Sequence, residues 1–211
     1  MITVALVDDH AAIRSGLAMM LGRQDDIEIV AEADNGASAV TVTRTHEPDV
    51  VLMDIRMPGT DGIEATRQIV ATTRSRVLVL TTFDLDEYVF AALRAGASGF
   101  LLKTATSDEL TGAVRSVAEG DAVLAPQAAR ALIGEFVQLP PKRDAPPGFD
   151  DLTEREREVL ALLGAGLSNA ELSHRLGVGG PTVKTHVSRV LSKLHLSSRV
   201  QAAILARELG L

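Results

Sequence analysis

Short apolar runs alternate with amphipathic stretches along the first 120 residues. The runs are rich in Val, Ile and Leu and too short for buried helices, which indicates strands, whereas the stretches between them have helical spacing. Repeated strand–helix units of this kind predict a doubly wound α/β fold, with a parallel sheet between two layers of helices. The expected strands are Ile2–Val7, Ile27–Ala33, Val50–Met53, Val77–Leu80 and Gly99–Leu102, and the expected helices are Ala12–Gly22, Gly36–Thr45, Gly62–Ala71, Glu87–Ala95 and Ser107–Glu119.

The end of the chain has helical spacing throughout. Thr153 and Glu156 have the spacing of a capping box, which marks the start of a helix. The turn Gly177–Gly180 separates a second helix from a third. This arrangement predicts a small all-α four-helix domain with helix–turn–helix geometry, in which the third helix would enter a DNA major groove. The expected helices are Glu154–Ala165, Ser168–Leu176, Pro181–Leu194 and Val200–Leu209.

The region between these parts has a different character. An alanine-rich pattern at Gln127–Phe136 predicts one extra helix. Four prolines among the eleven residues Gln138–Gly148 then predict a semi-stiff linker rather than a packed core. We therefore expect domains at residues 1–120 and 151–211, with residues 121–150 between them, and the linker leaves their relative orientation undetermined.

Charge separates the same two parts. Residues 1–125 hold 19 acidic and 10 basic residues, whereas residues 151–211 hold six acidic and eight basic residues. An acidic front and a mildly basic back suggest different partners. The chain has no cysteine, which excludes disulfides and thiolate chemistry. It also has no apolar run long enough for a membrane span and no basic leader, so we expect a cytoplasmic protein with no membrane partner.

Polar residues follow the expected strands at the point where each strand ends. Asp8 and Asp9 end the first, Asp54 the third, Thr81 the fourth and Lys103 the fifth. The carboxyl ends of parallel strands share one edge of the sheet, where such folds bind their ligands. Three crowded carboxylates favour Mg²⁺, while an ammonium and a hydroxyl suit phosphoryl oxygens. This chemistry fits an aspartate nucleophile at Asp54, although an isolated aspartate could equally cap a turn.

These residues carry a resemblance. Asp8-Asp9, the run Asp54–Gly62, Thr81 and the run Ala95–Lys103 resemble, in this order, the receiver domain of two-component response regulators. The resemblance covers residues 1 to about 120 and implies a flavodoxin-like sheet of five parallel strands. It implies that Asp54 is the phosphoacceptor and that Thr81 and Lys103 contact the phosphoryl oxygens. By the same resemblance, Mg²⁺ is held by Asp8, Asp9, Asp54 and the backbone carbonyl of Arg56.

Three details qualify this resemblance. Phe100 matches the aromatic residue that moves inward when a receiver is activated, so it is a candidate switch residue, although a strand aromatic is more often plain core. Thr81 and Thr82 compete for one role, and Thr81 is preferred because it lies 22 residues before Lys103. Thr104 follows Lys103 where many receivers have a proline, so no cis-proline is expected.

The end of the chain carries a second resemblance. Leu152–Leu160, Gly166–Leu172 and Thr182–Leu194 resemble the LuxR-type four-helix DNA-binding domain. This resemblance implies base-reading positions at Lys184, Thr185 and Ser188. Phosphate contacts are implied at Thr182, Arg189, Lys193 and Arg199.

The third helix departs from the LuxR-type pattern in two places. Gly179-Gly180-Pro181 replaces the usual serine, acidic and small residues. Gly180 should weaken the helix start by about 0.5–1 kcal/mol relative to alanine. Ser188 replaces a residue that is often basic, so sequence preference is expected to change.

Together the parts resemble a NarL/FixJ-type response regulator. The resemblance implies that a sensor histidine kinase phosphorylates Asp54, and that the phosphorylated chain forms a homodimer on promoter DNA and regulates transcription. RNA polymerase is a further candidate partner. The chain would not be an enzyme in the ordinary sense, although it would take part in its own phosphorylation and dephosphorylation.

Three alternatives remain open at this point. The chain could bind DNA without phosphorylation, although every residue of the acidic site is present. It could be a phosphohydrolase with Asp54 as nucleophile, but haloacid dehalogenase-type enzymes carry an aspartate general acid where this chain has Arg56. Finally, the last domain could bind protein rather than DNA, which a salt-sensitive shift of random duplex DNA would contradict.

Overall fold

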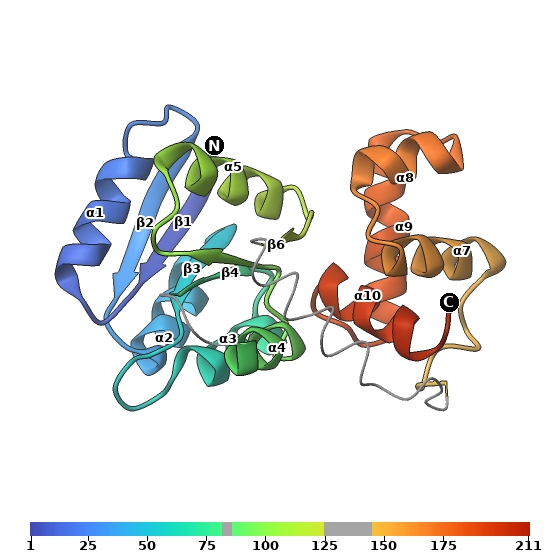
Figure 1. Cartoon of the computed structure of the whole chain (residues 1–211), viewed down its shortest axis with the longest axis horizontal. Helices are drawn as coiled ribbons and strands as arrows, with labels where there is room; N and C mark the ends of the chain where they lie inside the picture. Colours follow the sequence, from blue (N-terminus) through green and yellow to red (C-terminus); the bar gives the residue numbers. More distant parts are fainter. Residues whose placement is uncertain (82–85, 125–144) are drawn as a thin grey trace.

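The computed structural model describes residues 1–81, 86–124 and 145–211 (Figure 1). Thr82, the expected helix Gln127–Phe136 and most of the expected linker lie outside the described residues. We call residues 1–124 the front module and residues 145–211 the back module. The front module comprises β1 (Ile2–Val7), α1 (Ala11–Leu21), β2 (Ile27–Ala33), α2 (Gly36–His46), β3 (Val50–Asp54), α3 (Gly62–Thr72), β4 (Arg76–Thr81), α4 (Asp86–Arg94), β5 (Gly99–Leu102), α5 (Ser107–Ala118) and β6 (Val123–Leu124).

The sheet is fully parallel, with the strand order β2-β1-β3-β4-β5-β6. The five expected strands and the doubly wound α/β class are confirmed. The expectation of a five-stranded sheet is wrong by one strand, because Val123 and Leu124 pair with Gly99 and Phe100. A strand of two residues is too short to display an alternating pattern, so the sequence could not reveal it.

Two layers of helices enclose the sheet because its strands are apolar on both faces. In β3, Val50 and Leu52 pack with α1 and α5, whereas Val51 and Met53 pack with α2, α3 and α4. Successive strand residues point to opposite faces, so one apolar run supplies both cores. The central strand thereby delivers Asp54, its last residue, to the carboxyl edge of the sheet.

The back module consists of α7 (Glu154–Gly164), α8 (Asn169–Leu176), α9 (Gly180–Lys193) and α10 (Arg199–Glu208). These bounds match the four expected helices to within a residue or so, which is the usual uncertainty of helix ends. Capping boxes begin α7 and α8, whereas the Gly179 cap of α9 lacks a side-chain bond, as the departure from the LuxR-type pattern predicts. No helix among the described residues is long and apolar enough to cross a membrane.

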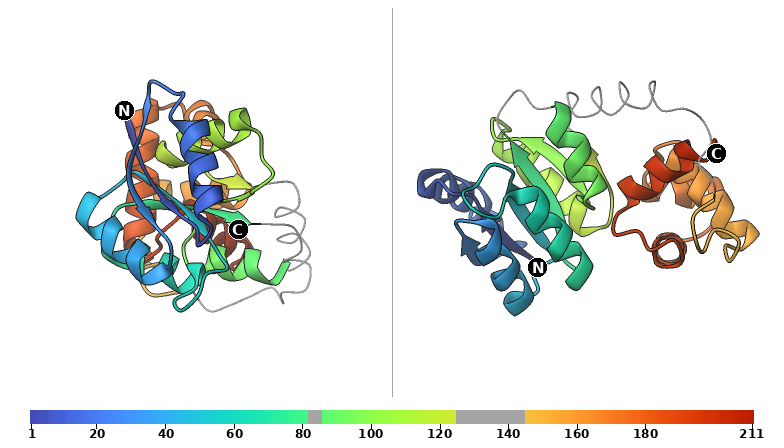
Figure 2. Two further views of the ribbon diagram at one scale, coloured as in Figure 1. Left: turned by 90° about the vertical axis from the view of Figure 1, so that its left-hand side faces the viewer. Right: turned by 90° about the horizontal axis from the view of Figure 1, so that it is seen from below.

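The two modules pack against each other through α4 and α10 (Figures 1 and 2). Val200 and Ile204 of α10 belong to the same buried cluster as Val89 and Leu93 of α4. Close approach is possible because the α4–β5 turn contains Gly96 with φ +108°, where a Cβ would lie 3.1 Å from the Cβ of Ser197. These apolar contacts determine the relative orientation that the linker composition leaves undetermined.

Candidate functional site

Lys103 lies at the centre of the acidic edge of the sheet. Its Nζ is 2.6 Å from Asp8 Oδ2 and 2.8 Å from Asp54 Oδ2. Asp8 and Asp54 are 1% and 5% exposed. The other oxygen of each carboxylate accepts a backbone hydrogen bond, from His10 to Asp8 and from Ile55 to Asp54. The expected meeting of the ends of β1, β3 and β5 is therefore observed for these three charged groups.

Burial and charge oppose each other at this site. Burial raises the pKa of Asp54, while the hydrogen bond and charge of Lys103 pull in the opposite direction. Burial alone would lower the pKa of Lys103, but hydrogen bonds to Asp54 and Asp8 raise it above its usual value. Lys103 therefore stays protonated and provides the cation that permits Asp54 to ionise in a water-poor environment.

The residues present fit a divalent metal ion. Two carboxylates contact the Lys103 ammonium and a third, Asp9, lies beside Asp8, so the site has an excess of negative charge. One ligand atom each from Asp8, Asp9 and His10 lies within 4.8 Å of the others. Carboxylate oxygens are the ligands that Mg²⁺ prefers, and Asp9 is only partly buried, which leaves room for retained waters. Sequence analysis missed His10, whose Nδ1 is 2.6 Å from Asp9 Oδ1, although its position directly after the aspartate pair was a usable signal.

The remaining expected receiver residues occupy the neighbouring strand ends. Thr81 ends β4, is 5% exposed, and accepts a backbone hydrogen bond from Lys103 N at 2.7 Å through its carbonyl. Phe100 in β5 is 2% exposed and packs into the cluster on the α4 side of the sheet. The Arg56 guanidinium lies over the ring of Tyr88, 5.7 Å from its centroid. The roles of these residues stay predictions.

A close backbone contact holds the loop after Asp54 in place. A Cβ at Gly62, the first residue of α3, would lie 1.9 Å from the carbonyl oxygen of Asp54. Gly62 N also donates to the Ile55 carbonyl, and the Asp61 side chain caps α3. Only glycine permits α3 to begin this close to the end of β3. The turn therefore positions the Asp54 end of the strand.

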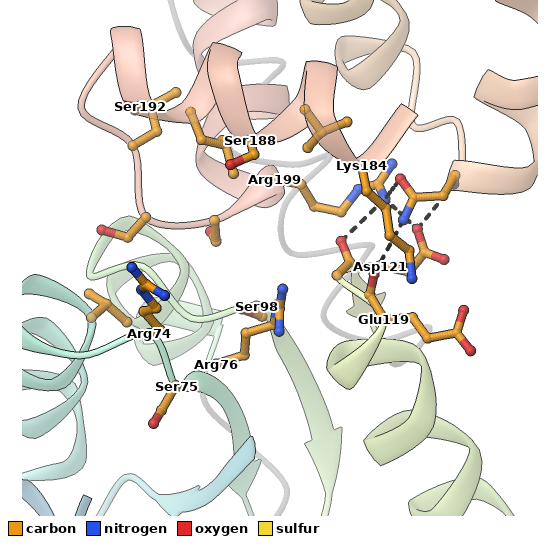
Figure 3. Close-up of a pocket in the computed structure, with 18 of the residues that line it drawn as sticks. Arg74, Ser75, Arg76, Ser98, Glu119, Asp121, Lys184, Ser188, Ser192 and Arg199 are labelled. Atoms are coloured by element: carbon orange, nitrogen blue, oxygen red, sulfur yellow. Dashed lines mark hydrogen bonds and ion pairs between the residues drawn. The ribbon is translucent and has the colours of Figure 1, made fainter. Parts of the chain in front are cut away.

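Most of the α9 side chains expected to contact DNA are exposed, but two of them face the front module. Thr182, Lys184, Thr185, Ser188 and Arg189 are all exposed on α9. Lys184 and Ser188 nevertheless line a cavity of about 440 Å³ between the modules, and the front-module wall of this cavity faces them (Figure 3). A DNA duplex cannot enter a space of this size, so in this arrangement these two side chains face the front module instead.

Two expected phosphate contacts are occupied by protein partners. Arg199 is 8% exposed, and its guanidinium binds Asp121 of the front module, the Asn169 side chain and the Leu167 carbonyl. Lys193 Nζ is 2.7 Å from a Glu156 carboxylate oxygen and donates to the Asp151 carbonyl. Sequence analysis missed Asp121, because helical spacing says nothing about a partner from another module.

The matched families cover both modules. Residues 4–115 match the family described as response regulator receiver domain, and residues 150–206 match the bacterial regulatory proteins of the luxR family.

Several known proteins are similar over nearly the whole chain. The DNA-binding transcriptional activator DevR/DosR of Mycobacterium tuberculosis (strain ATCC 25618 / H37Rv) is 39% identical over 210 residues, which cover 99% of this chain and 95% of that protein. The transcriptional regulatory protein LiaR of Bacillus subtilis (strain 168) is 40% identical over 207 residues, covering 98% and 97%. The crystal structure of the response regulator ChrA, from a heme-sensing two-component system, shares 42% identity with a TM-score of 0.55 and covers 98% and 96%.

Proposed function

This chain belongs to the DNA-binding response regulators of two-component systems that join a receiver domain to a LuxR-family domain, and we propose that Asp54 is its phosphoacceptor. The observation that carries the proposal is the position of Lys103 Nζ, within 2.8 Å of both Asp8 and Asp54. It supports a site in which an ionised Asp54 is available beside a cation that can bind phosphoryl oxygens. The two domains together indicate a regulator and not a classical enzyme.

The proposed reaction is a phosphoryl transfer from a sensor histidine kinase. A carboxylate oxygen of Asp54 attacks the phosphorus of a phosphohistidine, the P–N bond breaks, and the kinase imidazole leaves with the bonding electron pair. The backbone N–H of Ile55 holds Asp54 Oδ1, so Oδ2 is the oxygen that becomes available when Lys103 moves onto the phosphoryl group. Thr81, at the end of β4, would donate its hydroxyl to another phosphoryl oxygen.

Mg²⁺ is the proposed cofactor. Asp8, Asp9, Asp54 and the Arg56 carbonyl would hold it, and it would supply charge neutralisation for the phosphoryl group. The same site would support slow hydrolysis of the aspartyl phosphate, so the chain takes part in its own dephosphorylation.

We assign phosphoacceptance to residues 1–120, connection to residues 121–150 and DNA binding to residues 151–211. The assignment of DNA contacts to Thr182, Lys184, Thr185, Ser188 and Arg189 is supported by their exposure on α9. Lys193 and Arg199 would reach phosphates only after leaving Glu156 and Asp121, respectively. Binding to promoter DNA therefore requires the modules to separate, at least for Arg199, Lys184 and Ser188.

The route from phosphorylation to separation is supported by one shared cluster. Phe100 and the α10 residues Val200 and Ile204 pack into the same buried cluster, together with Val89 and Leu93 of α4. Movement of Thr81 and Phe100 would repack this cluster and loosen α10. The released chain would then form a homodimer that presents two α9 helices to paired half-sites. RNA polymerase is a candidate partner at that stage.

The test is sedimentation of the whole chain with Mg²⁺, in the presence and absence of beryllofluoride, a phosphoryl mimic. We expect the wild type to change from monomer to dimer and Asp54→Ala to remain monomeric. Asp25→Ala, which removes an exposed carboxylate elsewhere, should behave as the wild type. Dimerisation of Asp54→Ala, or failure of the wild type to respond, would contradict the proposal. DNA binding by the activated form should weaken steeply with salt.

A further inference from the structure

The cavity between the modules, whose lining residues are drawn in Figure 3, lies at the amino edge of the sheet. On the front module it is lined at the amino ends of β4, β5 and β6, by Arg74, Arg76, Ser98 and Asp121 among others. On the back module it is lined by α9 and the loop that leads into α10. Asp54 stands at the opposite, carboxyl edge of the sheet. The cavity is therefore separate from the phosphorylation chemistry.

Positive charge dominates the walls of this cavity. Arg74, Arg76, Lys184 and Arg199 line it, against the two carboxylates of Glu119 and Asp121. The buried Arg199 already uses Asp121 as its partner. Glu119 is therefore the one remaining carboxylate in the lining for three cations, and its exposed side chain points away from Arg74 and Arg76 (Figure 3).

The three remaining cations lack anionic partners. Within the described residues, the side chains of Arg74 and Lys184 have neither a hydrogen bond nor an ion pair, and the Arg76 guanidinium donates only to the Ala118 carbonyl, at 3.3 Å. Arg74 and Arg76 reach from the front module toward α9, which carries Lys184 (Figure 3). Cations from both modules thus face one partly open space, where their repulsion opposes closure and an anion would relieve it.

We propose that this cavity binds a triphosphate-bearing small molecule that bridges the two modules. Guanidinium groups bind phosphate oxygens in a bidentate manner, and an ammonium binds them as a point charge. Ser188 and Ser192 of α9 add hydroxyl donors on the same wall. A volume of about 440 Å³ lies in the range of small-molecule sites and accommodates a triphosphate group, with or without a nucleoside.

The bound triphosphate would oppose DNA binding. It would hold Lys184 and Ser188 against Arg74 and Arg76, and so stabilise the closed arrangement. This would allow the chain to respond to a second, soluble signal that acts against phosphorylation. The consequence for DNA rests on the proposed role of α9, whereas the binding site itself rests only on the cavity and its charges.

The test is calorimetric titration of the unphosphorylated whole chain with inorganic tripolyphosphate, without Mg²⁺, so that the acidic site does not contribute. We expect one binding event per chain. Arg74→Ala/Arg76→Ala and Lys184→Ala should each weaken binding by about tenfold or more, because each loses charge-assisted hydrogen bonds. Arg23→Ala/Arg67→Ala removes the same charge from exposed positions outside the cavity and should bind as the wild type.

A second variant separates a closed cavity from a charged surface. Ile204→Asn disrupts the α4–α10 contact yet leaves every cavity cation in place. It should lose tripolyphosphate binding if both walls are needed. Titration with ATP identifies the kind of ligand. Tighter binding of ATP than of tripolyphosphate would indicate a nucleotide, and binding of tripolyphosphate at least as tight as that of ATP would indicate an inorganic ligand.

Three results would overturn the proposal: no binding by the wild type, wild-type affinity in Arg74→Ala/Arg76→Ala, or wild-type affinity in Ile204→Asn. Loss of DNA affinity in Arg74→Ala/Arg76→Ala without any tripolyphosphate binding would instead assign these arginines to a DNA surface. Because the titration contains no DNA and no phosphodonor, its failure leaves the phosphoacceptor role of Asp54 unaffected.

Discussion

Glu156 is a nearly buried carboxylate, 3% exposed, that joins two helices of the back module. Its side chain accepts from Thr153 N in the capping box of α7 and lies 2.7 Å from Lys193 at the end of α9. The hydrogen bond from Lys193, followed by that from Thr153, lowers the pKa of Glu156 below its usual value of 4.5. A lowered pKa means that folding favours the ionised form, so the stabilisation exists above pH 4.5 and is lost as the pH falls below it.

Glu156→Gln should therefore lower the free energy of unfolding by about 1–2 kcal/mol at pH 7. Urea unfolding of the whole chain at a series of pH values measures this difference. We expect the difference from the wild type to shrink as the pH falls below 4.5, because the wild-type carboxylate is then protonated as well. Glu154→Gln, at an exposed position in the same turn, is the control. A difference that stays constant with pH would show that the charge of Glu156 is not involved.

At the scale of elements, the start of α3 determines the shape of the phosphoacceptor site. The Asp54 carbonyl and the first residue of α3 approach so closely that a Cβ at Gly62 would overlap the carbonyl oxygen. Any side chain there must push α3 away from β3 or displace the strand end. Strain of this kind in a packed region costs about 1–3 kcal/mol.

Gly62→Ala should lower the free energy of unfolding by about 1–3 kcal/mol. Because it moves the end of β3, it should also reduce the rate at which a small-molecule phosphodonor phosphorylates Asp54. Gly112→Ala provides a matched control, since Gly112 lies within α5 and has open space around its Cβ position. That variant should be stabilised by about 0.5–1 kcal/mol with unchanged phosphorylation. Equal behaviour of the two variants would contradict the importance of the α3 contact.

Helices and strands were predictable from the sequence wherever the regular spacing of apolar residues extends over several residues. The five long strands and the four helices of the back module show such periods, and β6 was missed because two residues carry none. The acidic site was predictable in outline, because parallel strands bring their ends to one edge. The burial of Arg199 against Asp121 was not predictable. In the sequence both residues look like exposed positions of a helix or a loop, and they are covered only when the two modules pack together.

At the scale of the whole molecule, an ion pair between the buried Arg199 and the half-buried Asp121 connects the modules beside the apolar α4–α10 contact. Burial lowers the pKa of Arg199, while the charge and hydrogen bond of Asp121 act against that shift and keep the guanidinium charged. Asp121 also accepts from Asn169 N at the start of α8. A buried cation that loses such a partner destabilises the arrangement that buries it.

Asp121→Ala should consequently favour separation of the modules and raise the DNA affinity of the unphosphorylated chain by about tenfold. A salt-controlled DNA titration with the whole chain measures the affinity, and small-angle scattering measures the accompanying expansion. Asp25→Ala removes the same charge at an exposed position and should leave both unchanged. Unaltered scattering in Asp121→Ala would show that the apolar contact alone holds the modules together.

The direction of β4 limits how the two ends of the sheet can communicate. This strand begins at Arg76 in the cavity and ends at Thr81 beside the acidic site, a span of roughly 17 Å for six residues. Electrostatic forces through physiological salt solution fade within about 8 Å. The field of a phosphorylated Asp54 that reaches α9 through solvent is therefore largely screened, and we expect the signal to cross the sheet as displacement of packed atoms. Dimerisation in response to beryllofluoride should therefore persist at salt concentrations that abolish DNA binding.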